Sequence, residues 1–118
     1  MAQHNELGKE AEQLAAGYLR KNGFTLLHQN WRYSRYEIDI IAVKNELLHI
    51  IEVKALQTDK YGNPEEAVTK KKFKFLQNAA DEFLNLHPRY RNLQFDILSI
   101  IMPPGKEATF FLIEDVFL

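Results

Sequence analysis

Four charged side chains stand at the ends of two apolar stretches that read as neighbouring β-strands. Glu37 and Asp39 begin the first stretch, and Glu52 and Lys54 end the second. Clustered carboxylate oxygens suit a hard cation such as Mg²⁺ or Mn²⁺. Such an ion lowers the pKa of bound water and stabilises charge on a phosphate, and a nearby lysine can neutralise the developing anion. These residue types therefore indicate metal-dependent phosphodiester hydrolysis, which needs no organic cofactor.

The turn between the two stretches decides whether the four side chains meet. Side chains of a strand alternate between its two faces. A two-residue turn at 44–45 predicts that Glu37 lies opposite Glu52 and Asp39 opposite Ile50, with all four charged groups on one face. Like charges opposite each other are unfavourable, and a bound cation would remove that penalty. A three-residue turn would instead put Asp39 and Glu52 on opposite faces.

The elements that must position these residues follow the order α-β-β-β-α-β-β. Apolar residues at intervals of three and four predict the helices, and short runs rich in β-branched and aromatic residues predict the strands. We expect one helix near 6–22, a second between its cap Thr69 and Pro88, strands over 24–34, 36–43, 46–55 and 93–102, and a short last strand within 108–118. The first strand is expected to break near Asn30. This pattern predicts a single α/β domain, residues 1–118, with a mixed sheet.

Both faces of the central hairpin are apolar. Ile38 and Ile40 are predicted on one face, and Ile41 and Ile50 on the other. A sheet of this kind must be covered on both sides. Two helices are few for that task, so a second subunit is expected to cover one face if the helices do not. A homodimer is therefore one of the expected partnerships.

The composition of the chain excludes several kinds of functional site. The chain has 118 residues, a net charge of −1 and no cysteine, which excludes disulfides, thiolate metal sites and a cysteine nucleophile. A cysteine-free chain suits the cytoplasm. No apolar run reaches the roughly 20 residues of a membrane span, and the first ten residues do not resemble a secretory signal. The four histidines lack the spacing of a zinc site, and His49 is expected to be a packed core residue.

Lysines gather in the middle of the chain, where residues 54–74 hold six of them against three acidic residues. A basic patch of this kind attracts polyanions such as DNA. The expected phosphate contacts are Lys60, Lys70, Lys71, Lys72 and Lys74, joined by Arg32 and Arg35. Trp31, Arg32 and Tyr33 could also stack on bases, although the preferred interpretation of Trp31 is a core or dimer contact. The alternative interpretation of the lysines is a solvated face of the second helix.

The ordered motifs resemble a known group of proteins. Asp39, Glu52 and Lys54 look like the D…(D/E)xK signature of restriction-endonuclease-like nucleases, and the order of elements is similar to their core. More closely, the chain resembles the YraN-like family of uncharacterised bacterial proteins, which are similar in fold to archaeal Holliday-junction resolvases. The resemblance spans about residues 8–100. It rests on GKEAEQLAAGYLRKNGF, NWRYSRYEIDIIA, IIEVKA, YGNPEEAV with the following lysines, and FDIL.

The resemblance implies roles for individual residues. Asp39 and Glu52 would bind the metal, with the Val53 carbonyl as a further oxygen ligand and Glu12 completing the site. Lys54 would be the catalytic lysine, and Glu37 would be an accessory acid in the catalytic group.

Two positions depart from the family pattern. Tyr36 stands where the family usually has glycine, and Leu56 where it usually has arginine. The bulky ring of Tyr36 could alter access to the site, and Leu56 removes a cation from the expected phosphate-binding surface.

Three functions remain open from the sequence. The leading hypothesis is a Mg²⁺- or Mn²⁺-dependent endonuclease that acts on DNA, including branched or flapped structures. The alternative is a nucleic-acid-binding module that keeps the fold and lacks turnover. The third is an interaction protein in which Glu37, Asp39, Glu52 and Lys54 form only an ion-pair cluster.

Overall fold

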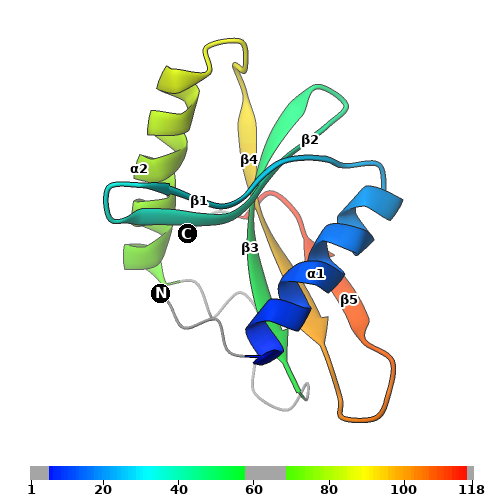
Figure 1. Cartoon of the computed structure of the whole chain (residues 1–118). Coiled ribbons are helices and arrows are strands. Elements are labelled where there is room, and N and C mark those ends of the chain that lie inside the picture. The colour runs from blue at the N-terminus through cyan, green and yellow to red at the C-terminus, as the bar shows by residue number, and fades with distance from the viewer. Residues whose placement is uncertain (1–5, 58–68, 117–118) are drawn as a thin grey trace.

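The computed structural model describes residues 6–57 and 69–116, and it shows a twisted sheet with one helix against each face (Figure 1). The elements follow the predicted order. They are α1 (Glu6–Lys21), β1 (Thr25–Tyr33), β2 (Tyr36–Lys44), β3 (Leu47–Leu56), α2 (Lys70–Leu86), β4 (Leu93–Ile101) and β5 (Thr109–Ile113). The described residues therefore form a mixed α/β fold, as the sequence predicts.

The five strands of the described ranges lie in the sheet in chain order, β1-β2-β3-β4-β5. β3 and β4 are parallel, and every other neighbouring pair is antiparallel. A parallel pair needs a crossover connection, and here the connection contains α2. The crossover brings the first turn of α2 back to the end of the sheet where β3 finishes (Figure 1).

Two apolar clusters hold the layers together, one on each face of the sheet. On one face, Phe73, Leu76 and Phe83 of α2 pack on Ile41 and Ile50. The opposite face carries α1, whose residues Ala11, Ala15 and Leu19 pack with Ile40, Ile51, Leu98 and Ile100. Each face of the central hairpin therefore contacts a helix of the same chain, and a homodimer stays a prediction.

The turn of the β2–β3 hairpin lies one residue later than predicted. Lys44 pairs with Leu47, so the turn residues are Asn45 and Glu46, with φ values of 53° and 66°. Two positive φ angles are what a tight hairpin turn of this twist requires. The expected partners of Glu37 and Asp39 were therefore wrong, because Ile50 pairs with Ile41. The turn still has two residues, so the predicted faces of Asp39 and Glu52 are preserved.

Strand β2 leaves the regular ladder at Asp39. Its pairing with β3 starts at Ile40 opposite Ile51, and the Val53 N–H donates to Asp39 Oδ2 at 2.8 Å. Ile38 belongs to the cluster under α2, whereas Ile40 belongs to the cluster under α1. The prediction that they share a face was wrong, because strict alternation does not continue through the point where β2 separates from β3.

Strand β1 is continuous, although two features mark an irregularity in it. The pairing register with β2 shifts between Leu26 and His28, and Asn30 has a left-handed φ of 54°. The predicted break near Asn30 is therefore a local distortion within one strand. Beyond it, the end of the β1–β2 hairpin turns towards α2, where Trp31 packs edge-on against Phe83 at 5.4 Å (Figure 1).

Neither of the helices in the described ranges is both long and apolar enough to pass through a lipid bilayer.

Candidate metal centre

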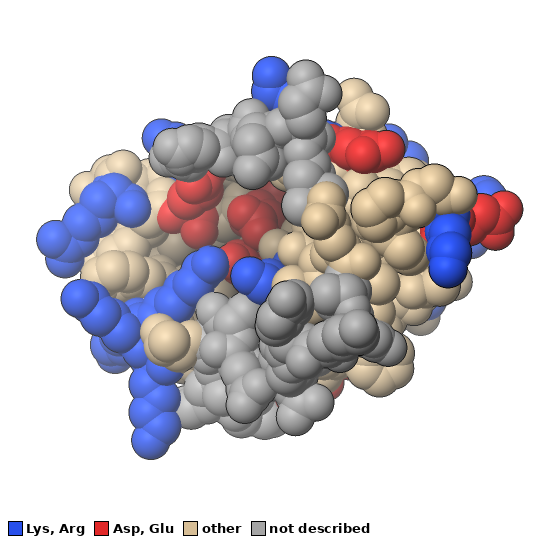
Figure 2. Space-filling model, turned by 90° about the horizontal axis from the view of Figure 1, so that it is seen from below, with Lys and Arg blue, Asp and Glu red and all other residues tan. Residues whose placement is uncertain are grey.

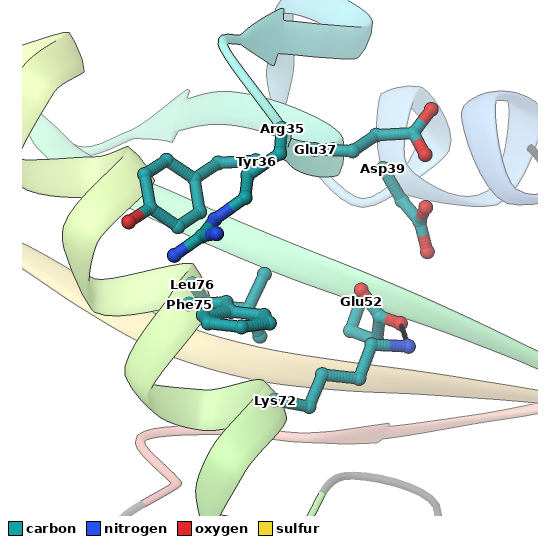
Figure 3. A pocket seen from close by; sticks show the side chains of 8 residues that line it. All are labelled: Arg35, Tyr36, Glu37, Asp39, Glu52, Lys72, Phe75 and Leu76. Atoms are coloured by element: carbon teal, nitrogen blue, oxygen red, sulfur yellow. Dashed lines mark ion pairs between the residues drawn. The ribbon is translucent and has the colours of Figure 1, made fainter.

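A cavity of about 180 Å³ opens where β2 separates from β3 and faces the first turns of α2 (Figure 3). Its walls come from all three elements and combine acids, bases and aromatic rings. The lining residues are Arg35, Tyr36, Glu37, Asp39, Glu52, Lys72, Phe75 and Leu76. The cavity therefore brings together three of the four acids that the sequence singled out as site candidates.

Asp39 and Glu52 lie close together and repel each other. Burial, followed by the negative charge of Glu52, raises the pKa of Asp39 from 3.8 to about 8, although the Val53 N–H opposes this rise. Figure 3 shows both carboxylates directed into the same space. Two carboxylates that share a site resist ionising together unless a cation compensates them. In the protein alone, Asp39 therefore tends to hold a proton at neutral pH.

Glu52 has a cationic partner that the sequence did not assign to it. Lys72 Nζ, from the first turn of α2, forms an ion pair with Glu52 Oε2 (Figure 3). The Glu52 side chain is 11% exposed, and that of Lys72 is 48% exposed. Partial burial would lower the pKa of Lys72, but the attraction of Glu52, Asp39 and Glu37 outweighs it and raises the pKa. The charges of all three carboxylates therefore act on Lys72.

The helix cap fixes the place from which Lys72 reaches the cavity. Thr69 caps α2 as predicted, and its Oγ1 accepts the Lys72 backbone N–H at 3.1 Å. Phe73 and Leu76 of the same helix are buried against the sheet. The apolar stripe thus sets the rotation of α2, and that rotation turns Lys72 towards Glu52.

The other predicted catalytic residues are divided between the cavity and its surroundings. Glu37 lines the cavity and forms an ion pair with Arg32 at 3.3 Å. Lys54 is half-buried on β3, in register with Ser99 of β4. Among the residues that the structure describes, the lysine that lines the cavity is Lys72, and Lys54 does not line it.

The predicted ligand Glu12 lies on α1 and contacts β1. Its Oε1 accepts a hydrogen bond from Asn30 Nδ2 at 3.3 Å. In the pairing of β1 with β2, Gln29 lies opposite Ile40 and Trp31 opposite Ile38, so Asn30 stands beside Asp39. Glu12 does not line the cavity, but it is hydrogen-bonded to Asn30, the β1 residue beside Asp39.

The donor set suits a hard divalent cation. Asp39 and Glu52 offer carboxylate oxygens at one point, and Asn30 Oδ1 is buried without a hydrogen-bond partner in the described part of the chain. An unpaired buried acceptor is uncommon in a folded protein. Mg²⁺ typically takes only one or two protein carboxylates and keeps several waters. The residues present therefore fit the ion that the sequence predicts.

A second polar cluster of similar composition lies on the other face of β3. His49, Asp96 and Glu114 offer ligand atoms within 4.8 Å of one another, and within the described residues they are the one such trio of His, Asp and Glu. Both Asp96 oxygens are already used. Oδ2 accepts from His49 Nδ1 at 2.6 Å, and Oδ1 accepts from Gln94 Nε2 and the Asp115 N–H. His49 is buried, as predicted, and within the described residues both oxygens of Asp96 are hydrogen-bonded.

The predicted nucleic-acid contacts lie mainly on exposed surface. Lys70, Lys71 and Lys74 are exposed on α2, and Lys60 lies outside the described residues. Arg35 stacks over the rings of Tyr36 and Phe75 at the rim of the cavity, at 5.7 Å and 5.5 Å. The view from below shows acidic side chains in a hollow, with Lys and Arg side chains gathered beside it (Figure 2). A cationic surface therefore adjoins the acidic cavity.

The fold and the cavity define a mixed α/β protein with a carboxylate site beside the sheet, consistent with a nuclease-like core. Residues 11–100 match the uncharacterised protein family UPF0102. The chain belongs to this family, which confirms the YraN-like resemblance.

Several relatives share most of their length with this chain, and each is called a UPF0102 protein. One from Bacteroides thetaiotaomicron is 42% identical over 106 residues, covering 90% of this chain and 88% of the relative. One from Phocaeicola vulgatus is 40% identical over 117 residues, covering 98% and 93%. One from Syntrophomonas wolfei is 38% identical over 104 residues, covering 87% and 90%. These names state a family and no activity.

Proposed function

We propose that this protein is a Mg²⁺- or Mn²⁺-dependent endonuclease that hydrolyses phosphodiester bonds in DNA. The observation that carries the proposal is the pair formed by Asp39 and Glu52. Burial, followed by the negative charge of Glu52, leaves Asp39 with a pKa of about 8. Folding a repulsive pair into a cavity is unfavourable for the protein alone, and perturbed carboxyl groups of this kind concentrate at functional sites.

Asp39 and Glu52 would hold the metal, with the Val53 carbonyl as a further oxygen and Glu12 and Glu37 as accessory acids. A divalent ion bound there supplies an activated water and stabilises charge on a phosphate. The Val53 N–H fixes one oxygen of Asp39 at 2.8 Å, and so orients the other. The buried position of Glu52 keeps its carboxylate facing the cavity instead of the solvent.

The start of α2 supports a polyanionic substrate. Lys70, Lys71 and Lys72 occupy its first turn, which contains no acidic residue. Positive charge at a helix N-terminus is unfavourable because it opposes the helix dipole. Phosphates bound there would interact with the lysines, the backbone N–H groups and the dipole together. We therefore extend the proposal to DNA phosphates. The resemblance of the family to archaeal Holliday-junction resolvases supports branched or flapped DNA as the substrate, and we propose the cytoplasm as the compartment.

A second candidate is a DNA-binding module without turnover, and two contacts favour it. Lys72 already neutralises Glu52. Tyr36 also stands in the cavity wall, held by Phe75 at 5.6 Å and by a hydrogen bond from Asn78 Nδ2 to its hydroxyl. In this alternative the ion pair is permanent, and the lysines still bind phosphates. A homodimer is compatible with both candidates.

A calorimetric Mn²⁺ titration of the wild type, Asp39→Asn and Asp81→Asn tests the metal site. Asp81 is an exposed acid of α2, so its variant is the matched control. We expect the wild type and Asp81→Asn to bind alike, and Asp39→Asn to lose affinity by at least tenfold because one of two charged ligands is removed. Equal binding by all three proteins would contradict the proposal.

Cleavage is then measured on linear duplex, single-stranded, flap and four-way-junction DNA with Mg²⁺ or Mn²⁺. Turnover that disappears in Asp39→Asn and persists in Asp81→Asn would support an endonuclease. Binding of junction DNA without cleavage of any substrate would favour the binding module. Equal cleavage by wild type and Asp39→Asn would identify a contaminating nuclease.

A further inference from the structure

We infer that Lys72 is an exchangeable cation of the metal centre, which neutralises Glu52 in the metal-free protein and turns to the substrate phosphate when a divalent ion takes that carboxylate. This inference rests on the proposed function. It assigns to Lys72 the role in the site that the sequence predicted for Lys54.

The ion pair is asymmetric in a way that permits this exchange. Glu52 lies on the central strand β3 with its side chain 11% exposed, whereas the Lys72 side chain is 48% exposed. The carboxylate is fixed by the sheet around it. The lysine side chain is long, flexible and open to water along one side. Only the lysine can leave the pair without exposing the core.

Lys72 and a divalent ion need the same oxygen atoms. The ammonium group pairs with Glu52 Oε2 inside the cavity that Asp39 also lines (Figure 3). A metal ion bound by Asp39 and Glu52 would stand next to the ammonium group and repel it. Binding of the ion therefore competes with the Lys72 pair, and removal of the ammonium should strengthen metal binding.

The position of Lys72 in the first turn of α2 allows its released side chain to reach a bound phosphate. Its backbone N–H is held by the Thr69 cap at 3.1 Å, so the Cα stays in place while the side chain moves. Lys70 and Lys71 lie beside it in the same first turn and are exposed. A phosphate at this turn would meet the released ammonium group on the side that faces the metal.

Lys54 is a poorer candidate for the same task. It is half-buried on β3, and in the described part of the molecule it does not line the cavity. Lys72 instead enters the cavity from the opposite layer, where it can reach both the carboxylates and the solvent.

The first test compares Mn²⁺ affinity in the wild type, Lys72→Met and Lys71→Met. Methionine keeps the length of the side chain and removes its charge, and Lys71 is the matched control in the same helical turn. We expect Lys72→Met to bind Mn²⁺ roughly threefold to tenfold more tightly, because a competing charge at the ligand is lost, while Lys71→Met stays within about twofold of the wild type. Equal affinities of Lys72→Met and Lys71→Met would overturn the inference.

The second test follows the Lys72 amine directly. Brief acylation with an N-hydroxysuccinimide ester, read by peptide mass spectrometry, reports how available each lysine is. Without divalent ion, Lys72 should react several-fold more slowly than Lys71, because its ammonium is paired and partly buried. Saturating Mn²⁺ should raise the Lys72 rate towards that of Lys71, which itself should not change.

The outcomes separate the inference from the proposed function. If the wild type binds Mn²⁺ and the Lys72 acylation rate does not respond, the inference is wrong and the metal centre stands. If the wild type binds no divalent ion, the proposed function fails and the inference fails with it. If cleavage is found, Lys72→Met should slow it at least tenfold despite tighter metal binding, whereas Lys72→Arg should retain most of it. Unchanged turnover in Lys72→Met would also overturn the inference.

Discussion

Strand β3 carries a buried polar residue on each of its faces, His49 on one and Glu52 on the other. Their surroundings differ in whether the neighbouring groups pair with one another. On the α1 side, His49 donates to Asp96, whose carboxylate accepts three hydrogen bonds in all. On the α2 side, Glu52 meets a second carboxylate, Asp39, and a lysine that is still half exposed. The first arrangement is complete within the protein. The second depends on a proton at Asp39 and on a partly exposed lysine at Glu52, both of which a cation could replace, so it offers a place for a ligand.

The comparison shows that composition alone does not identify a site. His49, Asp96 and Glu114 resemble a set of metal ligands more closely than Asp39 and Glu52 do. Yet a cation that entered the first cluster would have to displace hydrogen bonds that already satisfy Asp96. A cation at Asp39 and Glu52 would relieve a repulsion. The balance of donors and acceptors therefore favours the second place.

The same substitution in the two clusters should have opposite effects, and the larger one concerns Asp96. Asp96→Asn keeps the shape but turns one acceptor into a donor that faces other donors. We expect the protein to lose about 2 kcal/mol of unfolding free energy, because buried polar groups are left unpaired. Urea denaturation measures this loss. A change below about 0.5 kcal/mol would show that the network contributes little.

Asp39→Asn should stabilise the metal-free protein. The substitution removes the repulsion with Glu52, and an amide oxygen can still accept the Val53 N–H. We expect the free energy of unfolding to rise by about 1 kcal/mol at pH 8 in EDTA, because functional sites are often less stable than the fold allows. Asp81→Asn, on the exposed side of α2, is the control. A loss of stability in Asp39→Asn would mean that this carboxylate is structural.

The stability of the metal-free wild type should depend on pH in a direction set by Asp39. Its pKa is about 8 in the folded protein and 3.8 as the ordinary value. Between these values the folded state binds more protons than the unfolded state, so the Asp39 contribution to unfolding free energy falls as the pH rises. The difference between wild type and Asp39→Asn should therefore grow from about pH 4 towards pH 8. A difference that stays constant over this range would contradict the shifted pKa.

Two substitutions of Asn30, which has a left-handed backbone, distinguish backbone strain from a loss of metal binding. Asn30→Ala should be about 1 kcal/mol less stable than Asn30→Gly, because a side chain with a Cβ disfavours φ of 54° and glycine does not. Both variants remove the contact with Glu12, so they should weaken Mn²⁺ binding equally. Thermal unfolding measures the first effect and calorimetry the second. Unequal Mn²⁺ affinities would show that backbone strain, not the side chain, shapes the site.

Much of the fold follows from local patterns in the chain. The predicted order of helices and strands is confirmed, because apolar periodicity and the Thr69 cap act within a few residues of one another. The common face of Asp39 and Glu52 was also predictable. It needs only a hairpin turn with an even number of residues, so moving that turn by one residue changed the partners and not the faces.

The ion pair in the cavity and the hydrogen bond between His49 and Asp96 join residues far apart in the chain. Lys72 reaches Glu52 only because the crossover from β3 to β4 places the first turn of α2 beside β3, and four lysines of similar sequence context cannot be told apart locally. His49 meets Asp96 across the parallel pairing of the same two strands. Alternation fails between Ile38 and Ile40 because β2 separates from β3 there. Local periodicity thus set which residues face the site, and the packing of distant elements set which charges meet in it.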